Sequence, residues 1–435
     1  MNNEKMFSCE WLGRTLIIKT GKLARQADAA VLAQYGDTSV LATVVEAKVE
    51  REGVDFFPLM VEFEEKLYAA GVIKGSRWVK REGRPSDEAV LAGRMIDRTI
   101  RPLFSNESKK DVQVMITILS ADLQNDHDIV SLIAASAALS ISGVEWKGPV
   151  SGARVGRING KLIFNPTYAE REKSDLDLIV AGTKEKIVMI EANSSEINEE
   201  DMFKAIMAGQ KEMQEPIRLI NELKKVFGTK NKVLAKKLIS EDENKSLIEK
   251  EKIFVLAKDW INNNIKKILF DKNYYTKGER KLAVTAIKEC LDQYLFDQGV
   301  NKDVRAYAIN NLVEKMVEAE VTRAILEDKR RVDGRALDEI RLLSAEAGIL
   351  PRIHGSGLFQ RGETQVMSIV TLGAPGLEQS LEGIEGVGSK RFMHHYNFPP
   401  FSVGEAKPLR ATGRREIGHG ALAEKALLPF LPTKE

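Results

Sequence analysis

The chain has 435 residues, of which 43% are hydrophobic and 29% are charged, and its formal net charge is +2 at pH 7. This length allows roughly two to four domains with ordinary cores. The small net charge excludes a strongly basic protein, so any contact with nucleic acid must come from local clusters. The two cysteines are too few for a disulfide framework or a zinc site and fit a reducing compartment. Because the sequence has no apolar run of about 18 residues, we expect no membrane span and a cytoplasmic protein.

The first half of the chain shows strand signals followed by helix signals. Residues 13–63 contain short β-branched runs separated by glycines and are predicted to be strands. Apolar positions on one face of residues 89–100, and an alanine-rich run over 128–139, predict two helices. Residues 177–183 and 187–190 are typical of a hairpin. This order of elements indicates an α+β domain with helices packed on one face of a sheet.

The chain also contains a diverged copy of its own first part. A G-x-L-x-R pattern starts at Gly21 and again, 327 residues later, at Gly348. A G-acid-T-x-V pattern starts at Gly36 and again at Gly362. Because the spacing between the two patterns is nearly the same in both places, we predict a duplicated domain in which Gly36 and Gly362 occupy equivalent turns. The second copy is much shorter than the first, so we expect the chain to be incomplete.

A proline-free segment rich in lysine and glutamate separates the two copies. Its apolar residues hold helical spacing: Ile309, Leu312, Val313, Met316, Val317 and Val321. We therefore predict an all-helical region over residues 235–328. Its charged residues are most simply a solvated helix face, and RNA binding is the alternative.

The strongest candidate for chemistry is the run from residue 413 to residue 420, which reads GRREIGHG. Arg414 and Arg415 stand at the start of a predicted helix, where free backbone N–H groups and the helix dipole favour an anion. The planar fork of arginine matches the oxygens of a phosphate group. This run is therefore a candidate phosphate site.

Two interpretations of the same run stay open. In the first, Gly418 and Gly420 let the backbone approach a ligand closely. In the second, the arginines form a surface pair bridged to Glu416, and the glycines only ease helix packing. His419 by itself is more typical of a packed histidine than of a catalytic one.

Two further segments could contact RNA. Residues 74–86 form a basic loop around Trp78, and cations beside an aromatic ring suit the phosphates and bases of a single strand, although a disordered polar loop is the alternative. Residues 392–401 are dense in aromatic side chains. They are predicted to form a buried strand that enters a Pro-Pro turn, with a role in the core favoured over base stacking.

The helix that follows the basic loop carries a stripe of charged residues, namely Arg94, Asp97, Arg98 and Arg101. Such a stripe is usually a seam of ion pairs, although it could also line a cleft that binds phosphates. The acid pairs Asp126 with Asp128 and Asp175 with Asp177 are interpreted as turn and cap residues, and we assign them no metal.

Together these residues resemble the bacterial polynucleotide phosphorylase family along the whole chain. The matching runs are Arg81–Ser86, Ile96–Phe104, Ala134–Ser140, Asp175–Thr183, Val332–Arg335, His354–Phe359, Arg361–Gln365, His395–Pro400 and Arg414–Gly420. The resemblance implies an α+β fold with two ribonuclease-PH-like cores of the ribosomal protein S5 domain 2-like kind. These would be a first core over 1–230, an all-α domain over 235–328 and an incomplete second core over 329–435. It also implies a homotrimer around an RNA channel, with no membrane contact.

The resemblance further implies a 3′-to-5′ phosphorolytic exoribonuclease, a polyribonucleotide nucleotidyltransferase of mRNA degradation. In that reaction inorganic phosphate attacks single-stranded RNA at its 3′ end and reversibly releases nucleoside diphosphates, while arginines and Mg²⁺ hold the charge. By the same resemblance, Arg414, Arg415 and His419 belong to the phosphate and 3′-end pocket. Trp78, Lys80, Arg81 and Arg84 belong to the RNA path. The ligands of Mg²⁺ are expected beyond residue 435, with none in this chain.

One departure from the family pattern concerns the basic loop. Val79 stands where the family has a stacking aromatic residue, which weakens the expected grip on RNA. Residues 1–435 alone are expected to hold part of the reaction centre and to be inactive. A catalytically silent RNA-binding ring subunit is the alternative. The duplication within one chain and the Arg414–Arg415 pair favour the enzyme.

Overall fold

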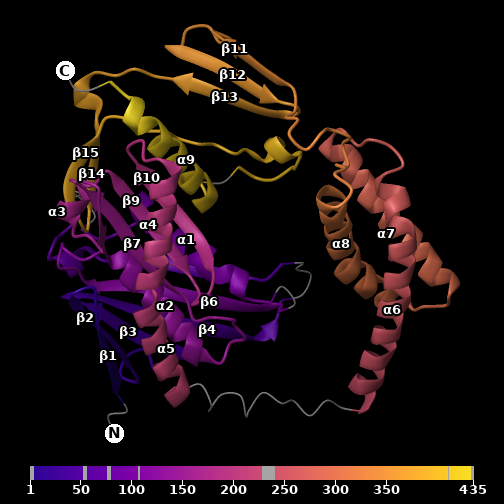
Figure 1. Cartoon of the computed structure of the whole chain (residues 1–435), viewed down its shortest axis with the longest axis horizontal. Helices are drawn as coiled ribbons and strands as arrows, with labels where there is room; N and C mark the ends of the chain where they lie inside the picture. The colour runs from indigo at the N-terminus through magenta and orange to yellow at the C-terminus, as the bar shows by residue number, and fades with distance from the viewer. Residues whose placement is uncertain are drawn as a thin grey trace. The chain divides into compact units, whose positions relative to one another are not determined.

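The structure of the protein is a computed structural model that describes the chain outside residues 1–3, 52–55, 76–79, 106–107, 228–240, 410 and 433–435, and outside the side chains of 241–250. The chain divides into two compact units (Figure 1). The first unit comprises Met1–Lys236 together with Ala374–Glu435, and the second comprises Lys237–Gly373. Among the described residues, no helix is both long and apolar enough to cross a membrane.

The first unit is built on a six-stranded sheet. In spatial order its strands are β1 (Lys5–Trp11), β2 (Arg14–Thr20), β3 (Ala29–Tyr35), β4 (Thr38–Glu50), β6 (Lys110–Ser120) and β5 (Leu59–Glu65). Only the pairing of β5 with β6 is parallel. Strict alternation of buried and partly exposed residues along β3 shows that one face of the sheet is packed on the core.

A second sheet of the first unit has four strands in the order β10 (Ile187–Ser194), β9 (Leu176–Gly182), β7 (Ser151–Ile158) and β8 (Lys161–Phe164). Helix α2 (His127–Ser142) packs against both β4 of the first sheet and β7 of the second. It is buried along almost its whole length, which explains why it is rich in alanine. The second sheet also packs against α4 (Glu199–Glu212), while α5 (Gln214–Phe227) lies against β1 and α2. A short helix, α3 (Tyr168–Arg171), joins β8 to β9.

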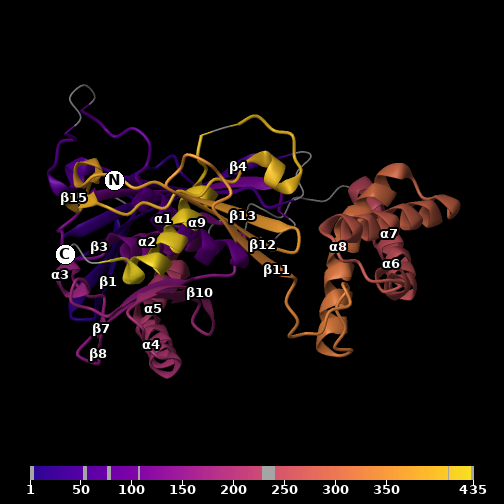
Figure 2. The ribbon, with the colours of Figure 1, turned by 90° about the horizontal axis from the view of Figure 1, so that it is seen from above.

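Helices α1 (Asp87–Ile100) and α9 (Arg414–Leu427) come from the two copies of the repeat and pack against each other (Figures 1 and 2). Each has 14 residues, the two start 327 positions apart, and each continues into a short 3-10 turn, η2 (Arg101–Leu103) or η5 (Leu428–Phe430). Ser86 caps α1, because its side chain accepts a hydrogen bond from the N–H of Ala89 at 2.9 Å. Helix α1 therefore has a counterpart in the second copy.

The remaining elements of the second copy in this unit are η3 (Pro375–Leu377), the hairpin β14 (Gln379–Gly383) and β15 (Gly386–Lys390), and η4 (Pro400–Val403). The turn of the hairpin reaches the core built by the first copy, where the side chain of Ile384 is 2% exposed. Each copy has a 3-10 turn that ends at a glycine with positive φ. In the first copy, η1 (Leu67–Ala70) ends at Gly71 with φ +69°. In the second copy, η4 ends at Gly404 with φ +71°.

In its described residues, the second unit holds three helices and a small sheet. The helices are α6 (Glu241–Leu269), α7 (Lys277–Asp297) and α8 (Lys302–Leu326), and they share an apolar core. Helix α7 begins with a reciprocal cap, in which Thr276 and Glu279 each bind the backbone N–H of the other. The sheet comprises β11 (Leu343–Ala347), β12 (Gly355–Arg361) and β13 (Thr364–Val370) in that order.

The repeated turns are equivalent, as the sequence predicted. Gly36 links β3 to β4 with φ +60°, and Gly362 links β12 to β13 with φ +59°. Two residues before each glycine, a glutamine side chain donates to the glycine carbonyl, from Gln34 at 3.0 Å and from Gln360 at 2.8 Å. Positive φ is costly for residues with a Cβ, so the glycine that occurs in both copies reflects a backbone requirement of this hairpin.

The predicted buried strand over residues 392–401 is wrong. Residues 391–399 have no regular secondary structure, and the side chain of Phe401 is 79% exposed. The backbone of this segment binds side chains of α9 instead. The N–H of His394 donates to Glu424 at 3.0 Å and that of Phe398 to Glu416 at 2.8 Å. Because these N–H groups are already bound and Pro399 and Pro400 have none, the segment cannot continue a strand ladder.

Candidate functional site

The first turn of α9 is closed by a glutamate. One carboxylate oxygen of Glu416 accepts from the N–H of Gly413 and the other from that of Phe398, both at 2.8 Å. These backbone hydrogen bonds hold the pKa of Glu416 below its usual range. Glu416 is therefore a cap, and the predicted alternative in which it bridges the two arginines is wrong.

Arg415 and His419 lie one turn apart on α9, and both are exposed. The guanidinium carbon of Arg415 is 4.7 Å from the centre of the Phe398 ring, and the ring of His419 is 4.3 Å from that of Tyr396. The two aromatic rings are stacked with centres 6.2 Å apart. We call Tyr396, Phe398, Arg415 and His419 the aromatic strip. The expectation of a packed core histidine is wrong, because the side chain of His419 is exposed and contacts Tyr396 at the surface.

Gly418 and Gly420 serve helix packing. Both are buried. A Cβ on Gly418 would come within 2.2 Å of Nε of Arg94 in α1, and one on Gly420 within 2.9 Å of the carbonyl oxygen of His394. These contacts support the second interpretation of the glycines and contradict the first, since protein atoms already occupy the space beside them.

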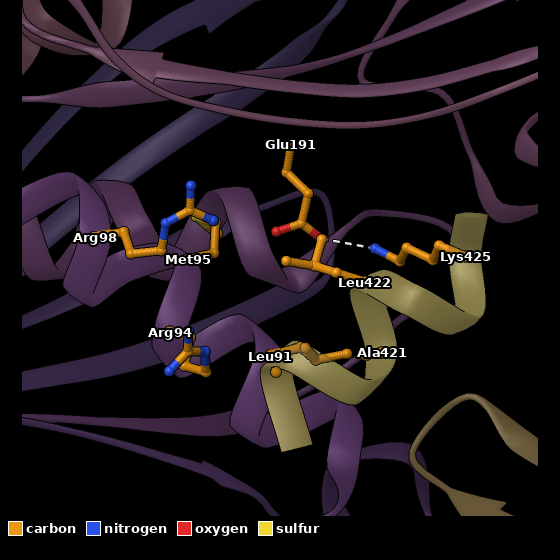
Figure 3. Close-up of a pocket in the computed structure, with 9 residues that line it drawn as sticks. Leu91, Arg94, Met95, Arg98, Glu191, Ala421, Leu422 and Lys425 are labelled. Atoms are coloured by element: carbon orange, nitrogen blue, oxygen red, sulfur yellow. Dashed lines mark hydrogen bonds and ion pairs between the residues drawn. The ribbon is translucent and has the colours of Figure 1, made fainter. Parts of the chain in front are cut away.

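A pocket lies between α1 and α9 and is shown in Figure 3. Its lining residues are Leu91, Arg94, Met95 and Arg98 of α1, Gly418, Ala421, Leu422 and Lys425 of α9, and Glu191 of β10. Lys425 is bound to Glu191, with 2.6 Å between Nζ and Oε1. In the described part of the chain, Arg94 and Arg98 have no carboxylate partner, so the pocket carries net positive charge.

The residues of the charged stripe of α1 thus fall into two groups with different contacts. Arg101 binds both carboxylate oxygens of Asp97, at 2.6 and 2.8 Å, and also donates to the carbonyl of Leu59 at 3.0 Å. This half is the seam of ion pairs that was predicted. Arg94 and Arg98 form the other half and line the pocket. Its cavity of about 20 Å³ is too small to enclose a phosphate, so the alternative of a phosphate-binding cleft stays a prediction.

The basic loop is only partly described. Lys80, Arg81 and Arg84 are exposed, whereas Trp78 and Val79 lie outside the described residues. Glu82 attaches the loop to the body of the first unit, because its carboxylate accepts from the N–H of Leu67 at 2.9 Å. The three described cations are therefore available to a ligand.

A buried ionic cluster in the first unit was missed by the sequence analysis. The guanidinium of Arg154, with its side chain 5% exposed, binds Asp126, Asp128 at 3.2 Å and Asp177 at 2.8 Å. Burial alone would raise the pKa of Asp126, but Arg154 beside it holds that pKa below its usual range. Asp126 also caps α2, as predicted, by accepting from the N–H of Asp128 at 2.9 Å.

The second acid pair is not made of cap residues alone either, because Asp175 binds Arg157 at 2.8 Å. Both acid pairs therefore bind arginines of β7. Among the described residues, no three His, Cys, Asp or Glu side chains gather in a way that could hold a metal ion.

His127 makes the stability of this cluster depend on pH. Its Nε2 is 3.5 Å from Glu65 and 3.6 Å from Asp128, and its Nδ1 is 3.1 Å from the hydroxyl of Tyr168. Burial alone would lower the pKa of His127, but the hydrogen bond to Glu65 and the charges of Asp128 and Asp126 raise it from 6.5 to about 9.

A raised pKa in the folded state means that protonated His127 stabilises the fold. This stabilisation is fully present below pH 6.5 and is lost as the pH rises to about 9. We expect the urea midpoint of the first unit to fall across this range, and to fall less in a His127→Gln variant. Equal pH slopes for the two proteins would contradict the role of His127.

Both copies of the repeat are similar to the same known family. A model described as "3' exoribonuclease family, domain 1" matches residues 13–145 and 339–435, which together are more than half of the chain. The chain belongs to the 3′ exoribonuclease family. Domain 2 of the same family matches residues 148–212. The RNA binding domain of polyribonucleotide nucleotidyltransferase matches residues 250–336, which include most of α6 and all of α7 and α8.

Similar proteins point to one branch of this family. The chain is 45% identical over 434 residues to a polyribonucleotide nucleotidyltransferase of Heliobacterium modesticaldum, covering 99% of this chain and 58% of that protein. It is 45% identical over 436 residues to the enzyme of the same name from Bacillus subtilis, covering 100% of this chain and 60% of that protein. A solved structure of rice Rrp46 covers 50% of this chain and 94% of its own with a TM-score of 0.40 and 16% identity, a likeness too low to support a conclusion.

The chain thus spans about three fifths of the length of these relatives. The fold class, namely ribonuclease-PH-like cores with a helical domain between them, is confirmed by the family matches.

Proposed function

We propose that this protein is a polyribonucleotide nucleotidyltransferase that degrades RNA from its 3′ end by phosphorolysis. The observation that carries the proposal is the arrangement of cations where the two copies of the repeat meet. Arg94 and Arg98 line the pocket from the first copy, and Arg415 lies on the exposed aromatic strip of the second. Anionic substrates need such cations, and aromatic rings beside them suit bases of a single strand.

In the proposed reaction, an oxygen of inorganic phosphate attacks the phosphorus of the last phosphodiester. The bond from that phosphorus to O3′ of the preceding nucleotide breaks, O3′ takes up a proton, and a nucleoside diphosphate leaves. Arg415 would hold phosphate oxygens with its planar fork, and His419 on the same face would donate a hydrogen bond to them. Arg94 and Arg98 would bind backbone phosphates near the 3′ end.

Further parts of the proposal rest on the family resemblance. We propose a first core over 1–230, an all-α domain over 235–328 and a second core from 329, a homotrimer, and action on mRNA in the cytoplasm. Mg²⁺ would neutralise charge in the reaction when bound. We also propose that a polypeptide of residues 1–435 alone binds RNA without releasing diphosphates. A silent RNA-binding ring subunit remains the second candidate, since the same cations would bind RNA without chemistry.

RNA binding by the described cations is testable by salt titration. Replacing Lys80, Arg81 and Arg84 with Ala should weaken binding of single-stranded oligoadenylate. It should also reduce the slope of log K against log salt by about 2, at roughly 0.7 per phosphate contact. Fluorescence anisotropy at several salt concentrations measures both. A matched control replaces Lys161, Lys173 and Lys184, which are also exposed, and should leave both values unchanged.

The Arg94→Ala, Arg98→Ala double variant should weaken binding in the same titration. An unchanged slope in both the loop and the pocket variants would contradict the proposed RNA path.

A further inference from the structure

Arg414 and Arg415 are neighbours in the sequence but have different surroundings. Both guanidinium Nη atoms of Arg414 bind β5 of the first copy, one to the carbonyl of Val61 and the other to the carboxylate of Glu62. Arg415 lies instead over Phe398 on the aromatic strip. Both arginines were expected to belong to the phosphate pocket. Their different contacts suggest instead that the two side chains have different roles.

We propose that Arg414 is a positioning residue. In this proposal Glu62 and the carbonyl of Val61 hold Arg414, and Arg414 fixes the first turn of α9 so that Arg415 and His419 face the anion. The proposal rests on the proposed function and deepens it, because it separates the arginine that binds phosphate from the arginine that orients it.

The position of β5 explains how it can bind Arg414. This strand is at the edge of the six-stranded sheet and pairs only with β6. The side chain of Val61 is buried on the core, whereas Glu62, the next residue, points to the other face and is 40% exposed. An edge strand has backbone groups without a partner in the sheet, and here an arginine from the second copy satisfies one of them.

The geometry of α9 supports the same division. Successive residues of an α-helix point about 100° apart, so Arg414, Gly418 and Lys425 share one face of α9. Every member of that face contacts the first copy. Arg414 binds Glu62, Gly418 packs against Arg94, and Lys425 binds Glu191.

Arg415 and His419 point about 100° away from this face. Helix α9 is thus held near both ends by ion pairs with the first copy, roughly three turns apart, while its neighbouring face is left for a ligand.

The ion pair between Arg414 and Glu62 should contribute more to the position of α9 than to the stability of the fold. The side chains of Arg414 and Glu62 are each 40% exposed, and ion pairs in contact with water contribute little to stability. Breaking this pair should therefore leave the protein folded. It should instead loosen the first turn of α9, and small displacements of a catalytic group reduce turnover strongly.

The test is a set of variants assayed for release of ADP from poly(A) at varied phosphate concentration, using the protein as the cell makes it. We expect Arg415→Ala to raise KM for phosphate about tenfold or more, since it removes a ligand of phosphate. We expect Arg414→Gln and Glu62→Ala each to lower kcat about tenfold while KM for phosphate changes less than about twofold. The double variant should be no worse than either single one, because both remove the same interaction.

A charge exchange makes the test specific. The variant with Glu62→Arg and Arg414→Glu together restores the ion pair in reverse and should recover most of kcat, with Tm close to that of the parent protein. The proposal is overturned if Arg414→Gln raises KM for phosphate as much as Arg415→Ala does, or if the exchange recovers nothing. If Arg415→Ala leaves KM for phosphate unchanged, Arg415 is not a ligand of phosphate and the division of roles is overturned. If the unaltered protein releases no ADP from poly(A) when phosphate is present, the proposed function itself fails, which is a different outcome from failure of the positioning role.

Discussion

Replacement of Arg154 with Met is expected to destabilise the first unit by about 3–5 kcal/mol, because it removes the shared partner of three aspartates and leaves buried carboxylates without compensation. The neutral side chain fits the volume, so the loss reflects charge and not a cavity. Urea unfolding followed by the fluorescence of Trp11, which lies in the core of this unit, and of Trp146, which packs against that core, measures it.

A matched control is Arg157→Met on the same strand. Arg157 also binds two aspartates, Asp175 and Asp201, but these are 39% and 36% exposed and stay hydrated when the arginine is lost. We expect a much smaller shift of the urea midpoint. Adding Asp126→Asn and Asp128→Asn to Arg154→Met should restore part of the stability, since no buried charge then lacks its partner. Equal losses in the Arg154 and Arg157 variants would show that burial of the cluster does not matter.

Replacement of Arg415 with Ala is expected to lower kcat/KM for phosphate on the order of 100-fold, the usual effect of removing one donor to a developing negative charge. Arg415→Lys keeps the charge but loses the planar fork, so its activity should be intermediate. Initial rates of ADP release at varied phosphate concentration measure the effect.

The control for Arg415 is Arg218→Ala, which removes an exposed arginine of α5 that pairs with Glu215 and Glu222 on the same helix. Its rate should match that of the unaltered protein. Comparable losses in both variants would assign the effect to general charge and not to the aromatic strip.

The duplication was predictable from the sequence because the repeated turns require particular backbone conformations. Turns at Gly36 and Gly362 need positive φ, so glycine persists at a fixed distance from its neighbours even where other residues diverge. The cap at Ser86 was predictable for a similar reason, since a cap is a local hydrogen bond between residues three apart. Local geometry of this kind can be recognised in one sequence.

Contacts between distant residues were not predictable. Arg154 binds Asp126 and Asp177, which are 28 and 23 residues away, and nothing in a single arginine on a strand indicates three aspartate partners. Gly418 and Gly420 could not be interpreted from the sequence, because packing against a helix and approach of a ligand both require the absence of a Cβ. The place of Arg94 and Arg98 beside α9 likewise follows only from the packing of the two copies.

The measurement that tests the central claim most directly is the identity of the product released from radiolabelled poly(A). The protein as the cell makes it is incubated with Mg²⁺, with and without inorganic phosphate, and the nucleotides are separated. Phosphorolysis predicts ADP that appears only when phosphate is present, and no ADP from residues 1–435 alone even where that polypeptide binds poly(A). Release of AMP without phosphate, or phosphate-dependent ADP from residues 1–435 that is lost in Arg415→Ala, would contradict the account.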